Sequence, residues 1–236
     1  MAYHELHYNI PIAETGSFSG TSAGINKRNL MLKKLAEIIE KYQYPVKSQF
    51  KVQKQEDGSF VFTTTSDQDK QRLIANVFRK TPEKLSEKEA NSTAEQCFLQ
   101  AKKLYNFTKL QDENGKPITL SDETALDMIG IIYTLRLTSY QRYMSTTIVD
   151  NVSRECMAEI LESKYDLPGV DIENVSVRKY NYAPYLSHIV GYTGQVQESQ
   201  LADLQKQDSS YAVNDVVGVW GLEKSEDLVL KGKKGY

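Results

Sequence analysis

Hydrophobic and polar residues alternate near both ends of the chain and recur at helical spacing in its middle. Residues 5–13 place Leu6, Tyr8, Ile10 and Ile12 between polar neighbours, and residues 170–177 alternate again. A period of two residues is typical of a half-buried strand. The β-branched run from Ser145 to Val149 predicts a third strand.

Helical spacing of apolar residues predicts four helices in the middle of the chain. They are expected over residues 26–42, over 67–78, from a capping box at Ser92–Glu95, and from a cap at Ser121 towards Leu137. A Gly/Ser-rich stretch over residues 15–25 predicts a loop before the first of them. Ser153 is expected to cap a further helix that bears Met157, Ile160 and Leu161.

A hairpin is predicted between the first two of these helices. Residues 50–52 and 60–62 alternate on either side of Glu56-Asp57-Gly58-Ser59. An Asp-Gly pair at such a place favours a turn in which both central residues have positive φ. Together with the helices and strands above, the hairpin indicates an α+β fold.

Composition and charge exclude several classes of protein. The chain has 236 residues, 40% hydrophobic and 25% charged, with a net charge of −2. That charge balance predicts no basic face for binding nucleic acid. No run reaches the ~18 apolar residues of a membrane span. The residues after Met1 do not have the pattern of a secretory signal. Cys97 and Cys156 lie on apolar helical stripes, so buried free thiols and a disulfide are both open.

The last seventy residues hold a series of short motifs in a fixed order. They are Leu167-Pro-Gly-Val170, Arg178-Lys-Tyr180, His188-Ile-Val-Gly191-Tyr192, Gly218-Val-Trp-Gly221-Leu-Glu223 and Lys231-Gly-Lys-Lys-Gly235. This order resembles the N-terminal dimerisation or pedestal domain of elongation-type class B penicillin-binding proteins. Two departures are visible: no Pro or Gly follows Tyr180, and the arginine motif that opens the domain in the family is absent.

The resemblance implies a discontinuous pedestal of strands and helices, residues 1–25 and 138–236, with a mostly helical head inserted at residues 26–137. It implies a non-catalytic, extracytoplasmic module of a membrane-anchored parent, a peptidoglycan D,D-transpeptidase whose catalytic domain would follow Tyr236. The resemblance implies three partners: that domain, a membrane glycan polymerase and an elongation scaffold. It leaves open a homodimer of the chain. The alternative is a stand-alone secreted protein that binds the cell wall.

Candidate catalytic residues are few, and the sequence argues against each. Ser176 and Lys179 have the Ser-x-x-Lys spacing of a penicillin-sensitive nucleophile, but a strand would point them to opposite faces. Neither Ser-x-Asn nor Lys-Thr/Ser-Gly occurs. His4 and His7 have the same strand spacing and no further ligand beside them, so neither a metal nor a cofactor is expected.

The site residues that we single out are therefore structural. The resemblance places Arg178 and Glu223 in a polar network at the root of the pedestal. His188 is interpreted as a structural histidine, and Gly218 and Gly221 as a turn with close backbone approach before a helix. The remaining members of this set are Tyr180 and Gly191. Tyr180, Tyr182, Tyr185 and Tyr192 lie close together in sequence. Ordinary core and rim tyrosines and an amphipathic contact surface are both open, with the former favoured.

Overall fold

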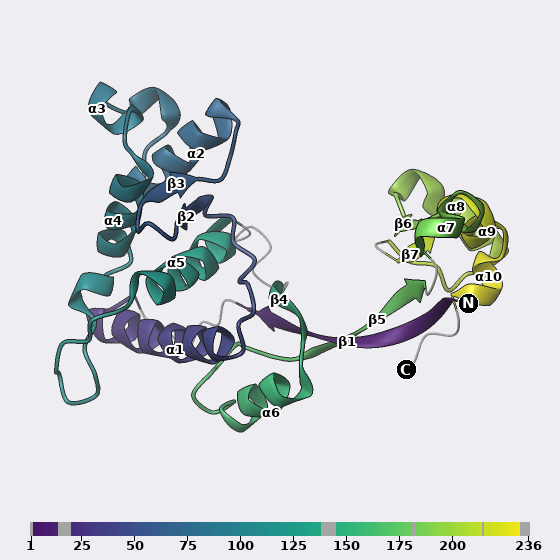
Figure 1. Cartoon of the computed structure of the whole chain (residues 1–236), viewed down its shortest axis with the longest axis horizontal. Coiled ribbons are helices and arrows are strands. Elements are labelled where there is room, and N and C mark those ends of the chain that lie inside the picture. The colour runs from purple at the N-terminus through teal and green to yellow at the C-terminus, as the bar shows by residue number, and fades with distance from the viewer. Residues whose placement is uncertain (1, 14–19, 138–144, 181–182, 214, 232–236) are drawn as a thin grey trace. The chain divides into compact units, whose positions relative to one another are not determined.

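A computed structural model describes residues 2–13, 20–137, 145–180, 183–213 and 215–231 (Figure 1). It divides into two compact units, one of residues 6–176 and one of residues 1–5 with 177–236. We call them the larger and the smaller unit. Strands β1 (Ala2–Ile12) and β5 (Glu173–Tyr180) each contain a unit boundary. The mixture of helices and strands confirms the predicted α+β class.

The three-stranded sheet has the order β4-β1-β5, where β4 is Thr146–Val152. Strands β1 and β4 are antiparallel, with Tyr8 opposite Val152 and Ile12 opposite Thr146. Their register shifts twice, next to Ile10 and Pro11. Proline has no amide hydrogen for the ladder, which explains an irregularity at this position.

The core of the larger unit lies between α1 (Ser22–Lys41) and α5 (Asp122–Leu137), which pack against each other. Leu32, Leu35 and Ile39 line the buried face of α1 at helical spacing. From Met128 to Thr134 every residue of α5 is buried. Helix α5 is thus enclosed by protein over two turns, and its apolar sequence follows from that burial.

The remaining elements of the larger unit pack on these two helices or on one another (Figure 1). The hairpin is β2 (Val52–Lys54) with β3 (Phe60–Phe62), and it contacts α4 (Ala94–Leu104) and α5. Helix α2 (Asp67–Phe78) packs on α4 and on the short α3 (Glu87–Ala90). Two 3₁₀ turns, Pro82–Lys84 and Phe107–Lys109, and helix α6 (Arg154–Glu162) complete the unit.

Three local expectations are corrected by the structure. Helix α1 begins at Ser22, not at residue 26, because the Thr21 hydroxyl caps it by accepting from Gly24 N at 3.2 Å. The second capping box uses Thr93 and Gln96 instead of Ser92 and Glu95. In the hairpin turn Gly58 has positive φ but Asp57 does not, because the turn spans Gln55–Ser59 and needs one left-handed residue.

Other strand and helix limits differ by a few residues. Strand β5 begins at Glu173, while Val170 forms an isolated bridge with Ile12. Strand β2 begins at Val52. On α6 the Ser153 cap is confirmed and Ile160 is buried, but Leu161 is 43% exposed and does not belong to the core.

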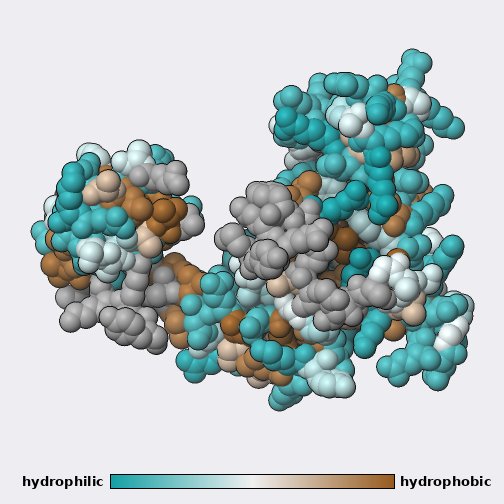
Figure 2. Space-filling model, turned by 180° about the vertical axis from the view of Figure 1, so that it is seen from behind, coloured by the Kyte–Doolittle hydropathy of each residue, from teal (hydrophilic) through white to brown (hydrophobic). Residues whose placement is uncertain are grey.

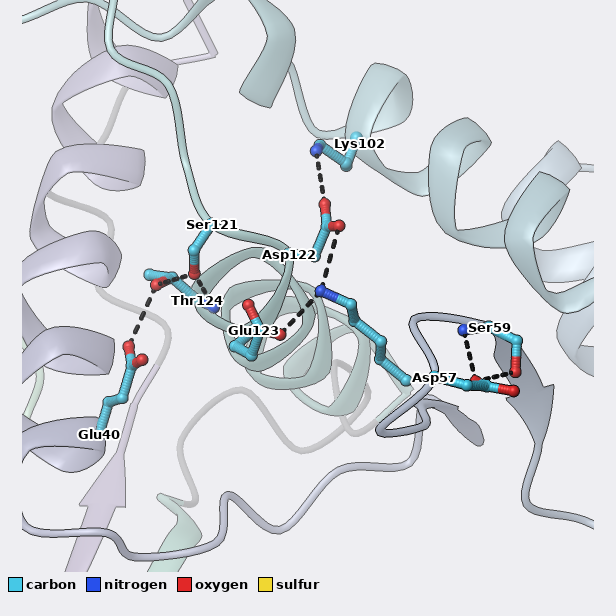
Figure 3. A network of polar contacts seen from close by, with 9 residues as sticks. Glu40, Asp57, Ser59, Lys102, Ser121, Asp122, Glu123 and Thr124 are labelled. Carbon is cyan, nitrogen blue, oxygen red and sulfur yellow. Dashed lines mark hydrogen bonds and ion pairs between the residues drawn. The ribbon is translucent and has the colours of Figure 1, made fainter.

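A network of polar contacts joins the start of α5 to its neighbours (Figure 3). Lys54 on the hairpin pairs with Asp122 and Glu123, and Lys102 on α4 also pairs with Asp122. Thr124 donates to Glu40 on α1 at 3.2 Å. The first turn of α5 is therefore tied to three elements that are distant in sequence.

The smaller unit is built from short elements around one hairpin. Strands β6 (Thr193–Gln195) and β7 (Val216–Gly218) pair antiparallel, with Thr193 opposite Gly218. The helices are α7 (Ala183–Val190), α8 (Glu198–Gln207), α9 (Gly221–Ser225) and α10 (Asp227–Leu230). Its buried apolar cluster consists of Val196, Tyr211 and Val217, with Leu201 and Leu204 packed against them.

The two cysteines are free thiols, and both side chains are buried in the larger unit. Burial raises the pKa of Cys97 and of Cys156 to about 11. Of the two possibilities left open by the sequence, the structure supports the reduced pair. No helix among the described residues has the length and apolar character needed to cross a membrane.

The division into a head at 26–137 and a pedestal stays a prediction. The apolar core of the larger unit includes Ile10 and Val149 together with residues of the predicted head. Thr138, where the predicted pedestal would resume after the head, lies outside the described residues.

Candidate functional site

Gly191 and Gly221 bring two backbone segments of the smaller unit into direct contact. Gly191 ends α7 with φ +84°, and a Cβ atom there would lie 1.8 Å from the carbonyl oxygen of Trp220. Gly221 opens α9 with φ +66°, and its Cβ would lie 2.6 Å from the carbonyl oxygen of Ile189. Both positions require glycine for two reasons: the backbone is left-handed, and a Cβ atom would clash with a carbonyl oxygen of the other segment.

A second close contact between backbone segments lies at Gly218, three residues before Gly221. A Cβ atom on Gly218 would lie 1.9 Å from the carbonyl oxygen of Glu223 and 2.1 Å from its carbon. Those are backbone atoms of α9, so no side-chain rotation could make room. The Gly218-x-x-Gly221 spacing thus folds the chain back so that the end of β7 touches the helix that follows it, as the sequence predicts.

Glu223 is held inside this fold. It lies in the first turn of α9, 1% exposed, and the hydroxyl of Tyr180 on β5 donates to its Oε1 at 2.7 Å. A carboxylate in a first helical turn is also favoured by the positive end of the helix dipole. One partner of Glu223 therefore comes from the Arg178-Lys-Tyr180 motif, through its tyrosine.

A second buried carboxylate, Asp227, was not anticipated from the sequence. Gly218 N donates to its Oδ1 at 2.7 Å, and the Tyr211 hydroxyl donates to its Oδ2. Asp227 is 8% exposed and opens α10, so it joins β7, α10 and the segment before β7. A single acid within a polar stretch gives no sequence signal.

Tyr211 is the other residue that sequence reasoning missed. Burial and its bond to Asp227 raise the pKa of the Tyr211 hydroxyl. Lys231 lies over the ring, 3.7 Å from the centroid, and pairs with Asp208 at 2.6 Å. That pairing, with hydrogen bonds from Ser210, lowers the pKa of Asp208 to about 2.

The other predicted site residues are placed less informatively. Arg178 lies on β5, but its side chain is outside the described part of the structure. His188 is exposed on α7. Tyr192 is 61% exposed, while Tyr182 and the side chain of Tyr185 are outside the described residues. The structure thus brings together Tyr180, Gly191, Gly218, Gly221 and Glu223 from the predicted set.

The structure locates two Ser-x-x-Lys spacings. Ser176 and Lys179 both lie on β5, three residues apart, as predicted. A second such spacing runs from Ser48 to Lys51, just before β2. There the Lys51 ammonium donates to the Ser48 carbonyl oxygen at 3.2 Å, and the Ser48 hydroxyl accepts from Phe50 N at 3.0 Å.

The histidines do not gather metal ligands within the described structure. His4 and His7 both lie on β1, three residues apart. Among the residues that the structure describes, no group of three or more His, Cys, Asp or Glu side chains is arranged to hold a metal ion. The two buried carboxylates of the smaller unit, Glu223 and Asp227, accept hydrogen bonds from tyrosine hydroxyls and from a backbone amide.

These features define a class of protein: an α+β module whose most constrained residues fix the path of the backbone. The family comparison identifies that class. The chain belongs to the penicillin-binding protein dimerisation domain family, whose model matches residues 2–236.

Named relatives are peptidoglycan D,D-transpeptidases MrdA. The protein of Acinetobacter baumannii is 34% identical over 86 residues, which are 36% of this chain and 12% of that protein. That of Escherichia coli K12 is 26% identical over 148 residues, 62% of this chain and 23% of that protein. The chain therefore spans less than a quarter of either relative.

Solved structures of penicillin-binding protein 2B from Streptococcus pneumoniae also match. The protein of strain R6 is 18% identical with a TM-score of 0.43, covering 96% of this chain and 31% of that one. The protein of strain 5204 is 17% identical with a TM-score of 0.41, covering 98% and 32%.

Proposed function

We propose that this chain is the non-catalytic, extracytoplasmic module of an elongation-type class B penicillin-binding protein, and that it positions a transpeptidase domain. One observation carries this proposal. The dimerisation-domain model matches residues 2–236, whereas the related D,D-transpeptidases are several times longer than the matched region. A module of this kind has no acyl-enzyme chemistry of its own and acts by holding other domains in place.

The surface of the smaller unit supports a positioning role. Large apolar side chains are exposed next to the glycine crossing, and hydrophobic residues are visible on this surface in Figure 2. Trp220 is 56% exposed and Leu222 is 50% exposed. Val219 N bonds the Tyr192 carbonyl oxygen at 2.9 Å, which places the exposed Tyr192 beside them. Exposed apolar groups gathered in this way are typical of interaction surfaces.

The rigid backbone beneath that surface explains how it is presented. Trp220 and Leu222 flank Gly221, whose backbone is in contact with that of residues 189–191. The two side chains therefore leave the unit from a segment that cannot shift without a clash. We infer that this surface receives the transpeptidase domain of the parent protein.

Fluorescent β-lactam labelling tests the absence of catalysis. The chain alone should remain unlabelled, while the product of the intact gene should be labelled covalently at a serine outside residues 1–236. Labelling of the isolated chain would contradict the proposal of a non-catalytic module. An intact gene that encodes no further domain would instead favour a stand-alone protein that binds the cell wall.

The positioning role is tested in the intact protein. Trp220→Ala combined with Leu222→Ala should lower the thermal stability of the transpeptidase domain, because the docking surface is lost. Leu161→Ala, which removes another exposed apolar side chain from the larger unit, is the matched control and should leave that stability unchanged. Equal effects of both changes would contradict docking through Trp220 and Leu222.

Contacts with a membrane glycan polymerase, an elongation scaffold or a second copy are further parts of this proposal. Sedimentation of the isolated chain should show whether it forms a homodimer at micromolar concentration. Co-purification of the intact protein with the polymerase, repeated with residues 26–137 replaced by a short linker, tests whether the predicted head makes that contact.

A further inference from the structure

Two surface turns of the larger unit, residues 55–59 and 112–116, have the same backbone hydrogen bonds. In each turn the fourth residue is a glycine whose amide donates to the carbonyl oxygen of the first residue, at 2.9 Å and 3.0 Å respectively. The amide of the first residue donates to the carbonyl oxygen of the fifth, at 2.8 Å and 2.9 Å. The glycines, Gly58 and Gly115, have φ of +84° and +80°. The two turns are therefore a matched pair that differs in its side chains.

The side chain before the glycine is fixed in the first turn. It belongs to Asp57, whose Oδ1 accepts from the Ser59 hydroxyl at 2.6 Å and from Ser59 N at 2.8 Å. The same two bonds lower the pKa of Asp57. Its carboxyl group is therefore ionised and held, and an ionised carboxylate resists attack by a nucleophile.

The corresponding residue of the second turn, Asn114, has a neutral side chain with different surroundings. The backbone amides of Asn114 and Lys116 both donate to Asp112 Oδ1, at 2.9 Å and 2.7 Å. The fifth amide of this turn thus bonds the first side chain, whereas in the other turn it bonds the third. Among the residues that the structure describes, none forms a hydrogen bond with the Asn114 carboxamide.

The residue after Asn114 leaves the backbone nitrogen accessible. Asn114-Gly115 is the single Asn-Gly pair of the sequence, and both residues are exposed. No atom lies within 4 Å of the place that a Cβ of Gly115 would occupy, so nothing beside this nitrogen hinders its approach to a neighbouring carbonyl carbon. Its bond to the Asp112 carbonyl oxygen must open first, and bonds at exposed loop tips open at little cost in free energy.

We propose that Asn114 is a site of spontaneous deamidation, with water as the co-reactant. The Gly115 nitrogen attacks Cγ of Asn114, so that an N–Cγ bond forms, the Cγ–Nδ2 bond breaks, and ammonia leaves with the amide proton. Water then opens the resulting cyclic imide at one of its two carbonyl carbons and gives aspartate or isoaspartate. The sum is amide plus water to carboxylate plus ammonium, with no change of oxidation state. This inference does not depend on the function proposed above.

The product would affect the contact between this turn and α1. The Asn26 side chain on α1 donates to the Gln111 carbonyl oxygen at 2.8 Å and accepts from Gln111 N at 3.0 Å. Isoaspartate adds a carbon atom to the backbone and places a negative charge beside Asp112, where like charges repel. We therefore expect the turn to open and Gln111 to lose its contact with Asn26.

The test uses the whole chain, incubated in mildly alkaline buffer and then digested with trypsin. Asn114 is the one asparagine of the tryptic peptide 110–136, because Lys116 precedes a proline and is not cleaved. This peptide should gain the mass of an amide-to-acid change and separate into an aspartate and an isoaspartate form. Isoaspartate identifies the imide, because direct hydrolysis of the side-chain amide gives aspartate alone.

Asn91 is the internal reference. It is exposed, but it precedes Ser92, and its Nδ2 donates to the Glu87 carbonyl oxygen at 3.0 Å. Its peptide, 89–102, contains no other asparagine. Asn114 should react about ten-fold faster or more, which reflects a lower barrier to cyclisation. Asn114→Gln lengthens the side chain, disfavours ring closure and should abolish the mass gain of peptide 110–136.

Two results would overturn the site. One is a rate for Asn114 that is no higher than that for Asn91. The other is a product that contains aspartate without isoaspartate.

Hydrogen exchange tests the effect on α1 separately. In the aged chain the amides of Gln111 and Ile118, which bond Asn26 and Leu110, should exchange faster than in the fresh chain. Asn114→Asp is the control, because it adds the charge without the extra backbone carbon. Unchanged exchange after complete conversion to isoaspartate would refute the loss of this contact.

Discussion

The larger and the smaller unit are each stabilised by a different kind of interaction. In the larger unit, residues such as Leu35, Ile74 and Ile129 are fully buried in one extended apolar core. In the part of the smaller unit that the structure describes, the apolar cluster has three buried members, and buried carboxylates and close backbone contacts supply much of the remaining stability. A small unit buries too little apolar surface to rely on it alone. We therefore expect truncation of a buried side chain to destabilise the larger unit most. Addition of a side-chain atom to a glycine should destabilise the smaller unit most.

The largest expected effect is that of Phe98→Ala. Phe98 is 2% exposed on α4 and stacks on Phe60 with ring centroids 4.6 Å apart. Its truncation leaves a cavity and should cost the larger unit about 3–5 kcal/mol. Urea unfolding followed by helical circular dichroism measures this. Trp220 fluorescence, which reports on the smaller unit, should keep its midpoint. An equal shift of both signals would mean that the units unfold together and that the contrast fails.

Gly218→Ala tests the opposite sensitivity by adding one carbon atom. The new Cβ would meet the backbone of Glu223 at 1.9 Å, so α9 must move and the bond to Asp227 must weaken. We expect a loss of about 2–3 kcal/mol in the smaller unit, seen as earlier unfolding of Trp220 and faster amide exchange in β6 and β7. The control is Gly20→Ala, where no atom lies within 4 Å. Equal stability of the two variants would contradict a tight backbone crossing.

Asp127 makes the larger unit dependent on pH. Burial, followed by the charge of Glu40, raises its pKa from 3.8 to about 6. The folded state therefore holds this proton more tightly than the unfolded chain does, so stability falls as pH rises from about 4 to about 6. Asp127→Asn should stabilise the unit at pH 7 by up to about 3 kcal/mol and have little effect near pH 4.

The control for this experiment is Asp166→Asn, which removes an exposed carboxylate paired with Lys34. It should change stability by less than about 1 kcal/mol. A stability profile of Asp127→Asn that runs parallel to that of the parent chain between pH 4 and 7 would show that Asp127 titrates normally.

The smallest expected effect is loss of the hydrogen bond between Tyr180 and Glu223 in the smaller unit. Tyr180→Phe removes the hydroxyl that donates to the buried Glu223, and should cost about 1–2 kcal/mol because an acceptor loses its partner. Glu223→Gln should cost a similar amount. In a double-mutant cycle the two changes should be non-additive by more than about 0.5 kcal/mol. Additivity would assign Glu223 a different principal partner, of which Arg178 is the one that the sequence suggests.

Much of the secondary structure could be predicted because its signals are local. The limits of α2 and the end of α5 agree with the predicted ones, since capping residues and apolar spacing mark them directly. The start of α1 could not be read, because Gly24 suggests a loop while the deciding contact is the hydroxyl of Thr21. The shift of the capping box by one residue has the same cause: Ser92 and Thr93 are both suitable caps, and packing of the helix selects one.

Only the part of the site that lies within a short sequence motif could be predicted. Gly218, Gly221 and Glu223 form a short motif, so their roles could be proposed from their order alone. Asp227 and Tyr211 are 16 residues apart and their contact depends on the tertiary fold. No residue pattern within a window of the sequence contains that information.

The backbone crossings have a consequence at the level of the gene. Every single-base change in a glycine codon that specifies another amino acid introduces a side chain with a Cβ atom. At Gly191, Gly218 and Gly221 that atom would lie 2.6 Å or less from a carbonyl oxygen of the chain. These three codons can therefore drift only through synonymous changes unless the backbone opposite them moves as well. The smaller unit thus concentrates its mutational risk in very few nucleotides.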